Sequence, residues 1–130
     1  GSSGNATSAV RLLAAHQVEL PRVFAFDHPV GTVLGRAQYG EHFVFSQGCT
    51  VGNNHGRYPV LEDCVSLMSN AKVLGACHIG RNVIVAANAF VKDADIPDDS
   101  VVFGQDRNMV VVRGRGDANR EYFKSVFSDL

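Results

Sequence analysis

A six-residue period in the middle of the chain constrains its fold more than any other feature. From residue 61 the sequence divides into six hexads, LEDCVS, LMSNAK, VLGACH, IGRNVI, VAANAF and VKDADI. The first residue of every hexad is a branched aliphatic: Leu61, Leu67, Val73, Ile79, Val85 and Val91. The fifth residue is small or β-branched in five of the six, and Asp95 is the exception. Neither a helical period of 3.6 residues nor simple strand alternation produces this pattern.

The same period continues upstream in a different phase. Large apolar first residues recur at Val33, Tyr39, Phe45 and Val51. The fifth residues of these hexads are Ala37, Phe43, Cys49 and His55. Leu34 is as good a first residue for the first of these hexads as Val33. The next hexad would begin at Arg57, but the downstream block begins at Leu61, so four extra residues lie within 53–60. This polar segment contains Gly and Pro, and it predicts a loop extruded from the repeat.

A stack of short strands accounts for the period. Each hexad supplies one strand and one turn, with the aliphatic residue pointing to the coil axis and the small residue beside it. Stacking buries an interior that one coil leaves open. Ten hexads at three faces per coil make a little over three coils of one all-β domain. The 13 glycines and the absence of Trp suit many tight turns.

The three cysteines fit this fold without chemistry. Cys49 and Cys77 fall at small inward positions, which predicts buried hydrophobic side chains. The count is odd and no C-x-x-C occurs, so neither a disulfide framework nor a zinc ribbon is indicated. A reducing, cytoplasmic location is the expectation.

The two ends depart from the repeat. Residues 1–4 (GSSG) have the look of a cloning remnant, which leaves 5–130 as the domain. We expect a short helix over 8–17, a final strand over 101–112, and a helix over about 118–128 with Asp117 as its N-cap. Apolar residues gather on one side of the last helix: Tyr122, Phe123, Val126 and Phe127. This helix would cap the end coil or pack on a neighbouring subunit.

Composition excludes several classes of function. Apolar residues make up 45%, as in a globular protein, and the net charge is −1 with a pI near 6.6. No basic patch for nucleic acid or an anionic membrane is therefore expected. No apolar run approaches the roughly 20 residues that span a bilayer. No secretory leader is recognised at the start of the sequence.

Several ordered motifs point to a known family. They are 27–35 (DHPVGTVLG), 50–52 (TVG), 56–59 (GRYP), 71–75 (AKVLG) and 96–104 (IPDDSVVFG). These resemble the hexapeptide-repeat acyltransferases, and most closely the catalytic domain of serine O-acetyltransferase, over roughly residues 18–112. The resemblance implies a left-handed parallel β-helix and transfer of an acetyl group from acetyl-CoA to a hydroxyl. It also implies a homotrimer with active sites between subunits.

The resemblance assigns roles to particular residues. His28 matches the general base, which deprotonates the acceptor hydroxyl for direct attack on the thioester. Asp27 matches the residue that holds the amino group of serine. Arg57 matches the residue that contacts the acceptor carboxylate, with Tyr58 beside it. Glu19 lies nine residues before His28 and would orient the base if one hexad has been lost; a surface carboxylate is the equal alternative.

The family's cofactor strip maps onto turn residues here. Backbone N–H groups of Gly52 and Asn53 are the candidates for holding the oxyanion. The pantetheine arm would run past small and amide residues: Ser69, Asn70, Ala87 and Asn88. Arg107 and Lys72 would meet the nucleotide phosphates.

Departures from the family leave alternatives open. The second Gly of the family's Leu-Gly-Gly turn is Asn53, the His of its Arg-His-Pro loop is Tyr58, and its N-terminal helical domain has no counterpart here. The acceptor is therefore serine-like or a sugar hydroxyl. A non-catalytic binding or assembly module is a further alternative. A zinc enzyme is disfavoured, because the five histidines include no H-x-x-x-H pair, and we expect no metal.

Overall fold

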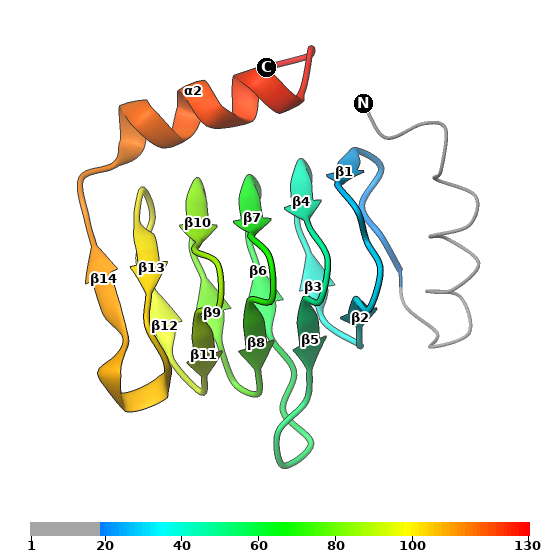
Figure 1. Ribbon diagram of the computed structural model, residues 1–130, viewed down its shortest axis with the longest axis vertical. Helices are drawn as coiled ribbons and strands as arrows, with labels where there is room; N and C mark the ends of the chain where they lie inside the picture. The colour runs from blue at the N-terminus through cyan, green and yellow to red at the C-terminus, as the bar shows by residue number, and fades with distance from the viewer. Residues whose placement is uncertain (1–18) are drawn as a thin grey trace.

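Three sheets form the sides of a triangular solenoid in the computed structural model, which describes residues 19–130. Sheet A contains β1 (Phe24–Phe26), β4 (Phe43–Phe45), β7 (Val65–Leu67), β10 (Val83–Val85), β13 (Val101–Phe103) and β14 (Val110–Val112). Sheet B contains β2 (Val33–Leu34), β5 (Thr50–Gly52), β8 (Lys72–Leu74) and β11 (Phe90–Lys92). Sheet C contains β3 (Gln38–Tyr39), β6 (Val60–Leu61), β9 (His78–Ile79) and β12 (Asp95–Ile96). Each coil takes one strand from each sheet, and the coils stack as a left-handed β-helix (Figure 1), which confirms the predicted fold. Residues 19–130 form four coils followed by β13, more than the predicted three or so, because β1 and β13 lie outside the predicted hexads.

The strand register measures the repeat directly. Val65 pairs with Val83, which lies three hexads further along the chain, so one coil takes three hexads. Thr50 pairs with Lys72, which lies three hexads and four residues further along. The four additional residues fall between β5 and β6, so the predicted extrusion within 53–60 is confirmed.

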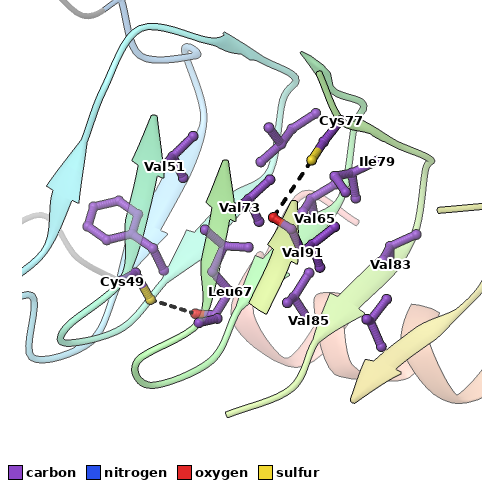
Figure 2. Packing of buried hydrophobic residues seen from close by; sticks show 14 of the residues in the cluster. Cys49, Val51, Val65, Leu67, Val73, Cys77, Ile79, Val83, Val85 and Val91 are labelled. Atoms are coloured by element: carbon purple, nitrogen blue, oxygen red, sulfur yellow. Dashed lines mark hydrogen bonds between the residues drawn. The ribbon is translucent and has the colours of Figure 1, made fainter. Parts of the chain in front are cut away.

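The aliphatic first positions fill the interior. All six residues predicted to face the axis are at most 2% exposed: Leu61, Leu67, Val73, Ile79, Val85 and Val91. Figure 2 shows Val73 and Val91 in one column with Val51 from the upstream block. Cys49 and Cys77 lie beside them, and burial raises the pKa of both thiols. Their prediction as buried small side chains is confirmed.

Two positions of the predicted repeat shift by one residue. Leu34 is fully buried and Val33 is 46% exposed, so the alternative start is the inward one. Asp95 is exposed because the fourth coil is one residue short at this point. Asp95 pairs with His78, which lies one residue less than three hexads before it in the chain. Ala94 therefore packs against the core, in the place that the fifth residue of a hexad normally takes. The missing residue explains why Asp95 did not fit the pattern of small fifth residues.

The segment expected as one final strand is a hairpin. β13 and β14 pair antiparallel, and the 3-10 helix η2 (Asp106–Asn108) lies in the connection. Gly104 makes the turn possible, because it has φ +80° and a Cβ there would lie 2.6 Å from the Asn108 carbonyl oxygen. A single Gly within the segment 101–112 is the sequence signal that marks this reversal.

The last helix, α2 (Gly116–Val126), begins two residues earlier than expected, so Arg115 is the N-cap and Asp117 lies in the first turn. It does not cap the end coil, and its packing on a neighbouring subunit stays a prediction. It crosses the outer face of sheet A along the stacking direction (Figure 1), where Phe123 and Phe127 pack on Ala25 and Val44.

Polar contacts fix α2 at three coils. Asn119 Nδ2 donates to the carbonyl oxygens of Asn82 and Ser100, 3.0 Å from each. The hydroxyls of Tyr122 and Ser66 are 2.9 Å apart. Beyond the helix, His42 Nε2 lies 2.7 Å from Asp129 Oδ2.

The expected remnant at 1–4 and the expected helix over 8–17 lie outside the described residues. Within residues 19–130, no helix combines the length and the apolar character needed to cross a bilayer.

Candidate functional site

The predicted site residues lie on two of the three edges of the solenoid. The A–B edge comprises the turns that lead from sheet A to sheet B: 27–32, 46–49, 68–71 and 86–89. The B–C edge comprises the turns from sheet B to sheet C: 35–37, 53–59, 75–77 and 93–94. Each edge collects one part of the predicted chemistry.

Asp27 and His28 begin the A–B edge in the first coil. Phe24 pairs with Phe43, one residue beyond three hexads, whereas Val33 pairs with Thr50, one residue short of three hexads. This first turn therefore has two extra residues. The longer turn leaves the Asp27 and His28 side chains in solvent, with 76% and 81% of their surfaces exposed. His28 has φ +48°, an uncommon conformation for a residue with a side chain.

A carboxylate contacts the predicted base, but it is that of Asp27 rather than the expected Glu19. His28 Nε2 lies 3.2 Å from Asp27 Oδ1. Glu19 is exposed, and over residues 19–130 no hydrogen bond or ion pair joins it to the imidazole. Asp27 is thus placed to hold the ring, and the orienting role of Glu19 stays a prediction.

A cavity of about 450 Å³ adjoins Asp27. Its other walls include Ser46 and Met68 from the A–B edge and Tyr122 and Ser125 from α2. The contribution of α2 was not foreseen, because it depends on how the helix packs. The apolar side that the sequence shows at Tyr122 and Val126 was the available signal.

Further along the A–B edge lie the residues predicted for the pantetheine arm. Asn70 and Asn88 adopt left-handed φ values of +63° and +64°. Their N–H groups donate to the carbonyl oxygens of Gln47 and Ser69, at 2.9 Å each. Within the described part of the chain, the N–H groups of Ser69 and Ala87 have no hydrogen-bond acceptor. The strip thus offers small side chains and free backbone donors, as an extended amide-bearing chain requires.

Basic residues accompany this strip. Gln105 Nε2 donates to the Asn88 carbonyl oxygen at 3.3 Å and joins the strip to η2, where Arg107 is exposed. Lys72 Nζ donates to the Asn70 carbonyl oxygen at 3.3 Å. The predicted phosphate contacts therefore lie at the end and side of the strip that leads away from His28.

The B–C edge carries the extruded loop, which is a tight β-hairpin. Asn54 and Arg57 exchange both backbone hydrogen bonds, each 3.0 Å. His55 and Gly56 between them have φ +50° and +74°, the signs of a type I′ turn. This turn holds the Arg57 backbone while its side chain remains exposed.

The residues beside the hairpin complete this second group. Tyr58 is 40% exposed, and the Arg36 guanidinium lies 5.5 Å from the centre of its ring. This is the range of a cation–π contact. Asn53 is exposed just before the hairpin, and among residues 19–130 its N–H has no acceptor. Arg57 can pair with a carboxylate here, and the free N–H can donate to an oxyanion.

One chain does not bring the two groups together. His28 and Asp27 lie on the A–B edge, and Asn53, Arg57 and Tyr58 lie on the B–C edge, with sheet B between them. In the described part of the molecule no hydrogen bond or ion pair links the groups. The same region contains no cluster of three or more His, Cys, Asp or Glu placed to hold a metal ion.

Comparisons with known proteins agree with the solenoid fold. Residues 58–93 match the family described as "Bacterial transferase hexapeptide (six repeats)". A serine acetyltransferase of Bacillus licheniformis is 32% identical over 102 residues, which cover 75% of this chain and 47% of that protein. The structure of a Neisseria gonorrhoeae serine acetyltransferase in complex with serine is 31% identical with a TM-score of 0.61. It matches 67% of this chain and 37% of its own.

A Brucella abortus serine acetyltransferase in complex with coenzyme A is 23% identical with a TM-score of 0.61 and supports the fold alone. The chain therefore belongs to the hexapeptide-repeat transferase family, with the left-handed β-helix as its fold. The Bacillus, Neisseria and Brucella proteins to which it is similar are serine acetyltransferases. A bifunctional GlmU protein of Lactococcus lactis is also similar, with 30% identity over 81 residues, which cover 60% of this chain and 18% of that protein. This chain spans about half of the length of the Bacillus relative.

Proposed function

We propose that this chain is an acetyl-CoA-dependent O-acetyltransferase whose acceptor is the hydroxyl of serine or of a serine-like molecule. One observation carries the proposal. The exposed His28–Asp27 pair opens the same edge of the solenoid that presents free backbone donors and small side chains at Ser69 and Ala87. The similar Neisseria gonorrhoeae serine acetyltransferase was solved with serine, which supports the acceptor half of the reaction, and the Bacillus relative is a serine acetyltransferase as well.

His28 is the general base. Its imidazole takes the proton of the acceptor hydroxyl as the oxygen attacks the thioester carbon, and it returns that proton to the departing thiolate. Asp27 Oδ1 faces the ring and stabilises the imidazolium, and its second oxygen is left for the amino group of the acceptor. Acetyl-CoA supplies the acetyl group as an activated thioester.

The residues of the loop bind the acceptor and polarise the carbonyl group of the thioester. The Arg57 guanidinium pairs with the acceptor carboxylate, for which its forked donors are well suited. The N–H of Asn53 donates to the oxygen that becomes negative in the transition state. The predicted donor at Gly52 lies in β5, where it pairs with β8, so Gly52 supports the turn rather than the oxyanion. The pantetheine arm follows Ser69, Asn70, Ala87 and Asn88 towards Arg107.

The complete site forms between copies of the chain. The base lies on the A–B edge and the loop on the B–C edge, so the two meet when the A–B edge of one copy faces the B–C edge of the next. Repeating this heterologous contact around a three-fold axis closes a ring. We therefore propose a homotrimer with three inter-subunit sites. The free thiols of Cys49, Cys64 and Cys77 suit the reducing cytoplasm.

A sugar hydroxyl is the second candidate acceptor. The Tyr58 ring is 40% exposed beside Arg57, and an aromatic face of this kind packs well on a sugar ring. A non-catalytic binding module is the remaining alternative, and the same experiment separates all three.

The test measures release of free CoA thiol from acetyl-CoA with L-serine or with a panel of sugars, with His28→Ala as the control. Release with serine that disappears in the variant supports the proposal. Release only with sugars keeps His28 as the base and reassigns the acceptor. Cofactor binding without release above that of the variant favours the binding module.

A further inference from the structure

The Arg57 hairpin is held by a residue two coils away. Asp93, on the B–C edge of the fourth coil, accepts a hydrogen bond from Asn54 Nδ2 at 2.7 Å through its Oδ2. Its Oδ1 accepts a second bond from the Ala76 N–H at 2.8 Å. The same carboxylate thus binds the third coil and the base of a hairpin that belongs to the second.

A glycine makes this reach possible. Gly75 lies between the two partners with φ +81°. A Cβ there would overlap Asp93 Oδ1 and would lie 2.8 Å from the Asn54 Cβ. Any side chain at this position would therefore separate the carboxylate from the hairpin.

Asp98 is a matched carboxylate that makes the bond between coils but, within residues 19–130, holds no hairpin. On the edge between sheets C and A, Asp98 Oδ1 accepts a hydrogen bond from the Arg81 N–H at 2.8 Å. It passes over Gly80, where a Cβ would overlap that oxygen. Both bonds join the fourth coil to the third at the same separation along the chain. Stacking the coils therefore needs one carboxylate oxygen, and the second oxygen of Asp93 is used for the hairpin.

The hairpin is also held on its other side. Tyr58 follows Arg57 directly, and its ring lies against the Arg36 guanidinium of the first coil. Arg57 is thus placed between Asn54, fixed from the fourth coil, and Tyr58, fixed from the first. The pKa of Asp93 is lowered by the bond from the Ala76 N–H and then by that from Asn54, which keeps the carboxylate charged and accepting.

We propose that Asp93 is a positioning residue for the acceptor loop, and that its hydrogen bond to Asn54 across Gly75 places the Arg57 guanidinium where the acceptor carboxylate binds. This inference rests on the proposed function for the role of Arg57. The clamp itself is a property of the hairpin and can be tested without catalysis.

The first test compares Asp93→Ala with Asp98→Ala. Each variant loses one carboxylate–backbone bond between the same two coils, but only the first releases the hairpin. We expect Asp93→Ala to raise KM for L-serine about tenfold, since small displacements of a binding group have large effects. Its KM for acetyl-CoA and the kinetics of Asp98→Ala should stay within about twofold of wild type. Equal KM values for serine in the two variants would overturn the proposal.

The second test reverses the hydrogen bond. Asn54→Asp opposes two carboxylates and should raise KM for serine as Asp93→Ala does. Adding Asp93→Asn supplies an amide donor to the new carboxylate, while the oxygen of that new amide still accepts from Ala76. The double variant should return KM to within about threefold of wild type. A double variant as impaired as Asn54→Asp would contradict the clamp.

Amide hydrogen exchange separates this proposal from the proposed function. The Asn54 and Arg57 amides are bonded to each other's carbonyl oxygens, so they report on the hairpin. We expect faster exchange of both in Asp93→Ala and no change in Asp98→Ala, whatever the activity. If wild type does not acetylate serine but these amides respond, the function fails and the clamp stands. Unchanged exchange would overturn the clamp.

Discussion

The last two coils and the first two are built on one repeat but are used differently. From the third coil to the fourth, the strands of sheets A and B pair at an interval of three hexads, with Val and Leu facing the axis. In the first two coils the turn at 27–32 has two extra residues and the segment 53–60 has four. The proposed base, His28, lies in the first insertion and Arg57 in the second. Burial fixes the repeat, and the departures from it free polar side chains for binding.

This comparison predicts that changes in the insertions affect catalysis and changes in the repeat affect stability. His28→Ala should lower kcat/KM with serine by about 10²–10⁴-fold, the usual contribution of a general base. The melting temperature should stay near that of wild type, because the side chain is 81% exposed. The matched control is His78→Ala, which removes another exposed histidine on sheet C. A His28→Ala protein with more than about a tenth of wild-type activity would contradict the role of the base.

A change within the repeat should do the opposite. Leu67 is fully buried in the third coil, and Leu67→Ala should lower the free energy of unfolding by about 2–5 kcal/mol. Denaturant titration measures this loss, with Val110→Ala on the exposed hairpin expected within about 0.5 kcal/mol of wild type. The kcat per folded molecule should be retained. If Leu67→Ala is as stable as wild type, the repeat does not carry the core.

A change at the second insertion should act on acceptor binding. Arg57→Ala should raise KM for L-serine about 10–100-fold, because it removes a charge-assisted pair with the carboxylate. KM for acetyl-CoA should change little. Arg113→Ala, which removes an exposed arginine after β14, serves as the control. If only the KM for acetyl-CoA rises, Arg57 binds the cofactor rather than the acceptor.

The smallest expected effect concerns the attachment of α2. The hydrogen bond from His42 lowers the pKa of Asp129 below its usual 3.8. A lowered pKa stabilises the fold at pH values above the usual one, and this contribution is lost as the pH falls through the lower folded value. Unfolding of wild type and Asp129→Asn at about pH 6 and pH 3 should show a difference at the higher pH that shrinks at the lower. A stability difference between wild type and Asp129→Asn that is larger at about pH 3 than at about pH 6 would contradict this prediction.

The sequence predicted the parts of the fold that burial dictates. A buried aliphatic at every sixth residue leaves few alternatives, so the coils, the insertion at 53–60 and the inward Cys49 and Cys77 follow from spacing alone. The one-residue deletion before Asp95 and the hairpin at Gly104 were missed, because single-residue changes of phase leave little trace in a pattern. The path of α2 across sheet A depends on tertiary packing, which a period does not encode.

The sequence motifs supplied the candidate site residues, whose roles stay predictions, but not their arrangement in space. Motif order identified His28 and Arg57, but nothing in the sequence indicates that they lie on different edges. Asp93 was overlooked as well, because its bond to Asn54 joins residues 39 positions apart. Gly75, the glycine that lets the carboxylate pass, was the one visible signal.

Mixing two impaired variants, His28→Ala and Arg57→Ala, tests most directly whether the two edges form one site between copies. His28→Ala keeps the loop and Arg57→Ala keeps the base, so either alone lacks one component at every site. When equal amounts are unfolded and refolded together, random assembly into trimers should restore about a quarter of the sites, since one interface in four joins the two intact edges. We predict about a quarter of wild-type activity, measured with serine well below the KM of wild type, where Arg57→Ala alone is strongly impaired. Activity no greater than that of the two variants refolded separately would contradict the account.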